Sequence, residues 1–452
     1  MILKFFIISL SILTITKGYA QSERLPLSLE GALNYAEEHA YLNRSSAYEI
    51  DAAHKKIRET IASGLPQIDF FGRYNHSMDL TKSLFPVEFF PEDNWPEGAK
   101  SGDKIAVAFG TAYDANYGIN VTQLIFDGSY FVGLQAAKVY LDLAEQQSKK
   151  IDLEIKSSVA QAYFLVLSAH ENQTAFKALL RINEALLYET KVMYNAGFVE
   201  AMDVSQMELL VNDARKRLKE VERNEQVTLA VLKFTLGIAD DIDLSLTDSL
   251  SWLSQRMLTG GGLPTVEMDA ANHPDYLLAM ANEESQRLLL KNEQVQYLPK
   301  INAFYNYQKV GYADEWNVFK DDWYKTQYIG LQMSLPIFSS GMRHARVQQR
   351  KIDYLKSQTE KEMAVHQLNN SYLTAQADMK NNNDQYLYSI QNKNLALDIL
   401  NKTHTKFSQG VASSSEFAQQ QSQYIQAQLN YVQSAVNLMN AHIALLKASG
   451  QL

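Results

Sequence analysis

The chain has 452 residues and a formal net charge of −9, from 42 basic and 51 acidic side chains. This acidic balance argues against a nucleic-acid partner, whose phosphates require a basic surface. The chain contains no cysteine, which excludes disulfides, thiolate catalysis, cysteine zinc sites and a cysteine-linked lipid anchor, and its 9 Pro and 20 Gly are few enough to favour long helices.

Residues 1–20 have the pattern of a secretory signal peptide. Lys4 provides a basic start, residues 5–15 are apolar, and Gly18 and Ala20 place small residues at positions −3 and −1 of a cleavage site. The mature protein is therefore expected to begin at Gln21 and to act outside the cytoplasm. No later apolar run approaches the ~20 residues that a helical membrane span requires, so insertion into a membrane would need a barrel of strands.

The rest of the chain is an internal duplication. Leu-Pro-Gln-Ile at 65–68 recurs as Leu-Pro-Lys-Ile at 298–301, and the glycine segment 194–199 recurs at 407–412. Each repeat is expected to contain a helix, two strands, a very long helix, a glycine turn and a second long helix. The expected units are a first repeat at 21–238, an inter-repeat linker at 239–269 and a second repeat at 270–452.

Each repeat supplies two segments of about ten residues in which apolar and polar residues alternate, the pattern of a tilted transmembrane strand. A soluble sheet packed on helices would show the same alternation. Four strands cannot close a barrel, so copies of the chain would have to share one. Two copies would supply eight strands and three copies twelve, and the polar inward faces with Gly118 and Gly330 favour the wider barrel. The expected strands lie at 66–77, 115–125, 299–309 and 327–337.

Long helices follow the strands, at 129–195 and 203–237 in the first repeat and at 341–407 and 415–448 in the second. The longest would measure about 95–100 Å at 1.5 Å per residue. Apolar and small residues recur in these helices with a seven-residue spacing, which indicates coiled-coil packing. Examples are Leu134, Ala162 and Leu165 in the first helix and Phe417, Tyr431 and Leu445 in the last.

This layout resembles the TolC-like outer membrane efflux proteins over essentially the whole mature chain. The resemblance rests on the duplicated Leu-Pro-x-Ile strand entry, the junction Leu-Ile-Phe-Asp-Gly at 124–128, the turn YNAGFVEAMDVSQM at 194–207 and the opening LSLEGAL at 27–33. It implies a homotrimer in which four strands per chain form a twelve-stranded barrel in the outer membrane of a Gram-negative bacterium. It also implies a periplasmic tunnel of α-helical coiled coil, passive transport, contact with outer-membrane lipid, and docking to a periplasmic adaptor protein and an inner-membrane pump.

The resemblance also assigns roles to the ends of the long helices. Aligned on the family's pattern, the pore constriction would be formed by Asp203, Glu416 and Gln419. The family's usual pair of aspartates one turn apart falls on Glu416 and Gln419, so this pair keeps one carboxylate and cation preference should be present but weaker. The family locks its closed end through a tyrosine and an arginine, for which this chain has Phe407 and Ala412, so the closed state needs other contacts or is looser. The adaptor is expected to dock on two turns formed by Gly197, Phe198, Val199, Gly410, Val411 and Ala412.

No pattern of catalytic or metal-ligating residues stands out. The nine histidines are scattered without metal-ligand spacing, and there is no phosphate loop and no nucleophile motif, so neither an enzyme nor a cofactor or metal site is expected. An alternative is a soluble periplasmic coiled-coil scaffold or adaptor without a pore of its own. The exported cargo could be a drug, a metal ion, a protein or an oligosaccharide, since the pump selects it.

Overall fold

The computed structural model describes residues 24–259 and 268–452, so the expected signal peptide lies outside the described residues. The chain forms two compact units, each built from both sequence repeats. Unit 1 comprises the described parts of Met1–Tyr48 and Gln146–Leu277 together with Met363–Leu452. Unit 2 comprises Glu49–Glu145 and Leu278–Glu362.

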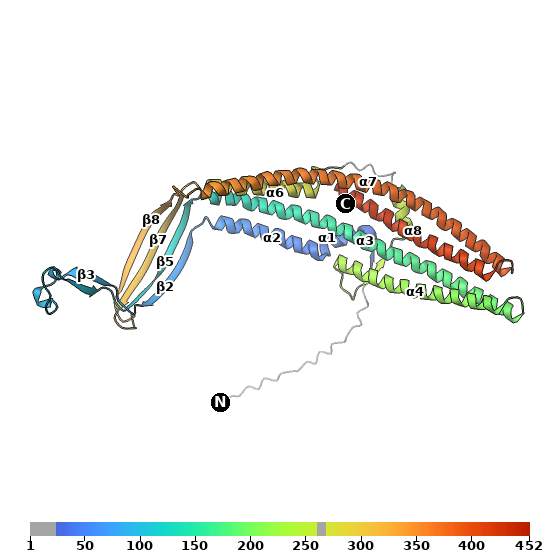
Figure 1. The fold of residues 1–452 in the computed structure, drawn as a ribbon, viewed down its shortest axis with the longest axis horizontal. Helices are drawn as coiled ribbons and strands as arrows, with labels where there is room; N and C mark the ends of the chain where they lie inside the picture. The colour runs from blue at the N-terminus through green and yellow to red at the C-terminus, as the bar shows by residue number, and fades with distance from the viewer. Residues whose placement is uncertain (1–23, 260–267) are drawn as a thin grey trace, which may run out of the picture. The chain divides into compact units, whose positions relative to one another are not determined.

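Unit 2 contains a four-stranded antiparallel sheet in the order β2-β5-β7-β8 (Figure 1). Two hydrogen-bonded strands from each repeat therefore form one sheet, and β2 and β8 each have a neighbour on one side only among the described strands. The loop expected between the first two strands carries a short hairpin, β3–β4, which simple alternation over so few residues did not indicate. The bounds are β2 (Gln67–His76), β3 (Lys82–Pro86), β4 (Lys104–Ala108), β5 (Tyr113–Phe126), β7 (Lys300–Ala313) and β8 (Trp323–Ser334).

Helices account for most of the chain, and their lengths repeat. The α4 and α8 helices have 36 residues each and are followed by the C-cap glycines Gly237 and Gly450. These glycines have φ values of 74° and 76°, a left-handed backbone that glycine tolerates best. Likewise α2 and α6 have 22 residues each. The helices are α1 (Leu29–His39), α2 (Tyr41–Ala62), α3 (Gly128–Asn195), α4 (Ala201–Leu236), α5 (Leu250–Thr259), α6 (Pro274–Val295), α7 (Met342–Ser408) and α8 (Ser414–Ser449).

The linker between the repeats is structured in its described part. Its strand β6 (Asp243–Leu246) pairs in parallel with β1 (Arg24–Leu27), which precedes α1. This pairing connects the start of the first repeat to the linker that follows that repeat. None of the described helices contains an apolar stretch long enough to cross a membrane.

The core of unit 1 follows the seven-residue spacing closely along α8, where Phe417, Tyr431 and Leu445 are all buried. Along α3 the spacing is a poorer guide, because Leu165 is 47% exposed although it was expected on the buried stripe. Its neighbours Tyr163 and Phe164 are fully buried instead. Several elements pack around this stretch of α3, so burial there depends on neighbours that are distant in sequence.

Candidate functional site

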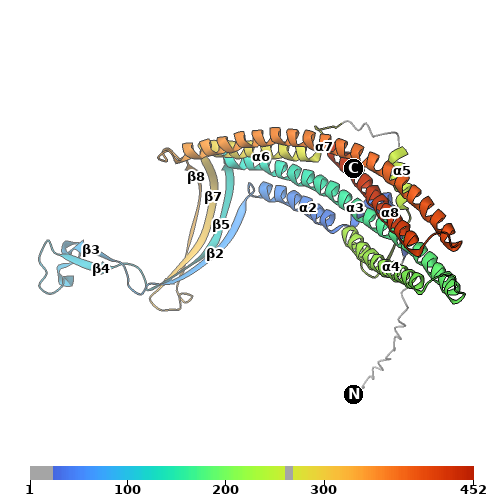
Figure 2. The same ribbon diagram turned by 45° about the vertical axis from the view of Figure 1, so that its right-hand side comes forward.

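Two turns join the paired long helices of unit 1, α3 to α4 (196–200) and α7 to α8 (409–413), as Figures 1 and 2 show. Each turn contains a glycine with left-handed backbone, Gly197 at φ 80° and Gly410 at φ 72°. In both, the N–H of the following residue donates to the carbonyl five positions earlier over 2.9 Å. The glycines therefore close their helices as C-caps and reverse the chain in a few residues.

One carboxylate links the two turns. The hydroxyl of Ser414, the first residue of α8, donates to Oδ1 of Asp203 over 2.6 Å. The other carboxylate oxygen, Oδ2, accepts from the backbone N–H of Glu200 over 3.1 Å and completes a capping box at the start of α4. Ser414 is 7% exposed, so water competes weakly for this charge-assisted bond.

The two residues that depart from the family's locking pattern pack beneath these turns. Phe407 and Ala412 are both buried, and the Phe407 ring lies 5.8 Å from the ring of Phe417. Ala412, expected as part of a docking turn, is therefore not on the surface. The same hydrophobic cluster also contains Leu186, Leu400 and Met207.

Phe407 has no hydroxyl to offer Asp203, and Ser414 makes the contact instead. One local pattern involves this residue, the run of three serines at 413–415, which is typical of a helix N-terminus. That signal explains Ser413, whose hydroxyl accepts from the backbone N–H of Glu416 over 3.2 Å. It does not indicate that the next serine reaches the other helix pair.

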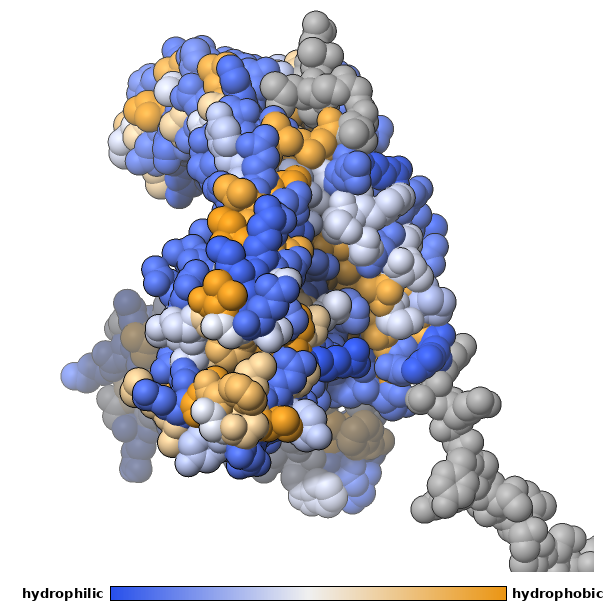
Figure 3. All heavy atoms as spheres, turned by 90° about the vertical axis from the view of Figure 1, so that its right-hand side faces the viewer, coloured by the Kyte–Doolittle hydropathy of each residue, from blue (hydrophilic) through white to orange (hydrophobic). Residues whose placement is uncertain are grey.

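The remaining predicted residues lie at the surface of this end of unit 1. Glu416 and Gln419 are exposed on the first turns of α8, three residues apart on the helix. Phe198 is 82% and Val411 is 73% exposed, one in each turn. Figure 3 looks onto the end of unit 1 that carries both turns and shows hydrophobic residues there among mostly hydrophilic ones. Exposed apolar side chains at a chain reversal are available to a protein partner.

The sheet of unit 2 has one apolar and one polar face. The register aligns Ile68, Val121, Tyr305 and Ile329 across the four strands on one face, where Ile329 is 81% exposed. On the other face the aligned row is Asp69, Asn120, Asn306 and Tyr328. A sheet with this division can separate an apolar from an aqueous environment.

Gly330 does not leave open space on the polar face. It pairs with Phe304 in the ladder, and a Cβ added to Gly330 would lie 2.7 Å from Cζ of the Phe304 ring. The aromatic ring thus lies over the glycine and fills the space that a side chain would take, a known way to stabilise glycine within a strand. The inference that this glycine widens the lumen is therefore not supported.

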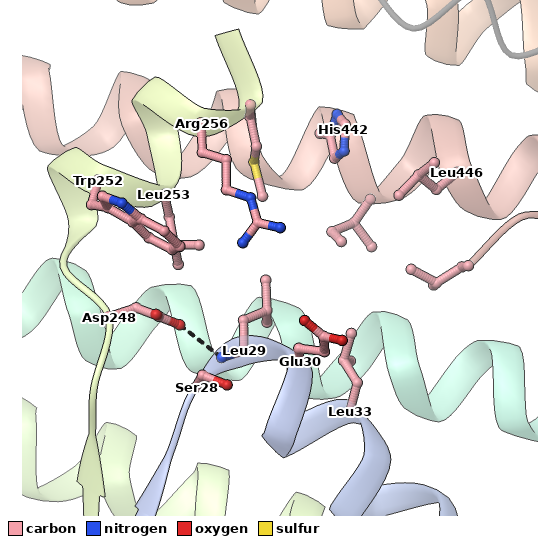
Figure 4. A pocket seen from close by; sticks show the side chains of 13 residues that line it. Ser28, Leu29, Glu30, Leu33, Asp248, Trp252, Leu253, Arg256, His442 and Leu446 are labelled. Carbon is pink, nitrogen blue, oxygen red and sulfur yellow. Dashed lines mark hydrogen bonds between the residues drawn. The ribbon is translucent and has the colours of Figure 1, made fainter. Parts of the chain in front are cut away.

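A cavity of about 660 Å³ lies in unit 1 between α1, α5 and α8 (Figure 4). Asp248 at its edge accepts from the N–H of Leu29 over 2.7 Å and from the hydroxyl of Tyr163 over 2.9 Å. Burial raises the pKa of Tyr163, which keeps its hydroxyl a donor. Arg256 lies 5.2 Å from the ring of Trp252 and points into the cavity. None of the predicted site residues lines this cavity, and its hydrogen bonds connect the linker to α1 and α3.

A family model described as outer membrane efflux protein matches residues 37–238 and 266–451. The chain is also 24% identical, over 250 residues, to the pyoverdine export outer membrane protein OpmQ of Pseudomonas aeruginosa. That match covers 55% of this chain and spans about half of the length of OpmQ, 50%.

Solved structures share the fold. The CmeC outer membrane channel of Campylobacter jejuni has a TM-score of 0.69 and 16% identity, over 94% of this chain and 85% of CmeC. The outer membrane protein VceC of Vibrio cholerae has a TM-score of 0.67 and 16% identity, over 93% of this chain and 96% of VceC. The fold class and the family resemblance expected from the sequence are thereby confirmed.

Proposed function

Because the chain belongs to the outer membrane efflux protein family, we propose that it forms the outer-membrane channel of a tripartite export system. The observation that carries this proposal is the antiparallel sheet of unit 2, with an exposed apolar face, a polar face and two outer strands that lack a second neighbour among the described strands. Transport would be passive through a lumen, with energy supplied by an inner-membrane pump. The family is one of transport proteins, so no reaction is proposed.

The sheet argues for a homotrimer. Backbone groups along the outer edges of β2 and β8 must find partners before the apolar face can enter lipid. Pairing β8 of one copy with β2 of the next supplies those partners, and three copies make a closed barrel of twelve strands. A barrel of this size leaves room for an aqueous lumen, towards which the row containing Asn120 and Asn306 would point.

A soluble periplasmic scaffold fits the sheet less well. In that case Ile68, Ile329 and the other members of the apolar rows would remain in water, because nothing in the described part of unit 2 covers them. At about 25 cal/mol per Å² of apolar surface, several exposed large side chains on one flat face carry a considerable cost. Lipid removes that cost.

The end of unit 1 that carries the two turns would be the periplasmic gate. Three copies of Glu416 and Gln419 would line the constriction, and the carboxylates would favour cations. The bond from Ser414 to Asp203 would hold the two helix pairs of each copy together in the closed state. This bond would replace the locking contacts of the family's tyrosine and arginine, for which this chain has Phe407 and Ala412.

The same end would receive the periplasmic adaptor. Phe198 and Val411 offer an exposed apolar side chain at each turn, and the glycines beside them keep the turns short. Binding there could open the gate only if the adaptor prefers the open arrangement, since a ligand shifts an equilibrium by its difference in affinity. The relative OpmQ is named for pyoverdine export, and this name supports the proposal that the present chain also exports a substrate, which the pump would select.

The proposal is tested by reconstituting the mature protein in planar lipid bilayers. We expect a trimer in detergent by light scattering, and cation-selective conductance after insertion. A monomer that stays soluble without detergent and never conducts would contradict the channel and support the scaffold.

A further inference from the structure

A belt of exposed apolar side chains lies where the strands of unit 2 meet their helices. Because the strands are antiparallel, β2 and β7 begin, and β5 and β8 end, at the same end of the sheet (Figure 1). Ile337 is 93% and Phe338 is 85% exposed in the segment between β8 and α7. We call this set the junction belt: Leu65, Ile125, Phe131, Tyr297, Leu298, Ile337, Phe338 and Met342.

Of the two long helices that begin beside the belt, only α7 begins with a concentration of basic residues. The first ten residues of α7 include Arg343, His344, Arg346, Arg350 and Lys351, with no acidic residue among them. The matching start of α3, residues 128–137, has no charged residue at all. The chain as a whole carries a net charge of −9, so the start of α7 has the opposite sign to the molecule's overall charge.

Helix stability does not account for the cluster. Positive charge in the first turn of a helix opposes the macrodipole, which favours acidic residues there. Arg343 is held in place, since it donates to the carbonyl of Pro336 over 3.0 Å and its guanidinium lies 5.8 Å from the ring of Tyr297. Arg350 pairs with Asp353 over 3.3 Å.

Two permanently charged members of the cluster remain available to bind an anion. Arg346 and Lys351 are exposed, and within the part of the chain that the structure describes neither forms an ion pair. They lie on either side of Arg343 around the helix, as the 100° step per residue dictates. Arg343, Arg346 and Lys351 therefore lie in the first ten residues of α7, directly after Met342 of the apolar belt.

We propose that Arg346 and Lys351, with Arg343, bind the phosphate groups of anionic phospholipids in the leaflet next to the junction, while the junction belt contacts the acyl chains. The proposal rests on the channel function, which places the sheet in a membrane. Apolar and aromatic side chains next to basic ones are the arrangement that an interface with anionic lipid favours. Guanidinium and ammonium groups supply the charge-assisted hydrogen bonds that a phosphate accepts.

The test measures lipid retention by the mature protein in detergent micelles with native mass spectrometry. Dioleoyl phosphatidylglycerol is the anionic probe and dioleoyl phosphatidylcholine the zwitterionic control. The double variant Arg346→Gln with Lys351→Gln should bind phosphatidylglycerol about twenty-fivefold more weakly, at about fivefold for each charge removed, and should lose the preference over phosphatidylcholine. The preference of the wild type should fall as salt is raised.

Two control variants distinguish lipid binding at this site from the effect of positive charge elsewhere on the protein. Arg346→Lys with Lys351→Arg keeps both cations and should keep the preference. Lys356→Gln with Lys402→Gln removes two exposed cations farther along the same helix and should also keep it.

Equal retention of phosphatidylglycerol by the wild type and by the double variant would overturn the inference. Displacement of the lipid by an equal concentration of inorganic phosphate would also overturn it, because the acyl chains would then contribute nothing. Conductance is recorded from the same preparations. A protein that conducts but shows no lipid preference contradicts the lipid site alone, whereas one that retains the lipid but never conducts contradicts the channel.

Discussion

Replacing Ser414 by alanine is expected to loosen the contact between the two helix pairs of each copy. The substitution removes the 2.6 Å bond to Oδ1 of Asp203 and leaves the 3.1 Å bond from Glu200 to Oδ2 intact. A hydrogen bond to a charged group contributes about 1.5–3 kcal/mol, and Asp203 is only half-buried, so water can partly replace the lost donor. We therefore expect Ser414→Ala to weaken the contact between the turns by about 2 kcal/mol. This loss shifts the equilibrium in each copy about thirtyfold from joined towards separated turns.

The assay is the open fraction of single channels in planar bilayers without adaptor. Ser414→Ala should raise the open fraction, while Ser414→Thr keeps a hydroxyl and should behave like the wild type. Ser413→Ala is the matched control, because it removes the cap to Glu416 at a cost of about 1 kcal/mol to the helix without touching Asp203. If Ser414→Ala gates like the wild type or like Ser413→Ala, the bond does not hold the closed state and the reasoning is refuted.

Three further predictions concern other residues of the two units. Glu416→Gln should move the reversal potential in a salt gradient towards zero, and an unchanged value would remove this residue from the constriction. Phe198→Ser with Val411→Ser should reduce co-purification of the adaptor while the trimer persists, whereas wild-type recovery would exclude the turns as the docking surface. The hydrogen bond from Lys361 lowers the pKa of Glu283 below its usual 4.5, so this contact stabilises the fold above that pH and is lost as pH falls through the lowered pKa. Glu283→Gln should therefore make Tm less sensitive to acidification from about pH 6 to about pH 3, and an unaltered pH dependence would show that the pair contributes no stability.

The duplication and the four long helices could be predicted from the sequence because they depend on local and periodic information. Gly197 and Gly410 mark the ends of helices through their own backbone freedom, which no distant residue alters. The buried stripe of α8, from Phe417 to Leu445, follows from helix geometry alone where a helix packs on one side. The alternation of β2 and β8 likewise predicted two faces of unequal polarity.

Contacts between residues distant in sequence could not be predicted in this way. Leu165 fits the stripe of α3 but is exposed, because the elements that pack around this helix decide which sides are buried. Phe304 lies over Gly330 because the register between two strands places them opposite each other. Ser414 reaches Asp203 across 211 positions of sequence, a distance that no local pattern encodes.

The sequence by itself therefore determined the repeats, the helix ends and the two faces of the strands, since each follows from residues within a few positions of one another. Only the tertiary structure decided which hydroxyl contacts Asp203, because that contact exists only after two separate helix pairs have packed. It also showed the basic start of α7 beside an exposed apolar belt, since the belt is assembled from four separate junctions. The acidic charge of the whole chain, which argues against a nucleic-acid partner, does not indicate this locally basic segment.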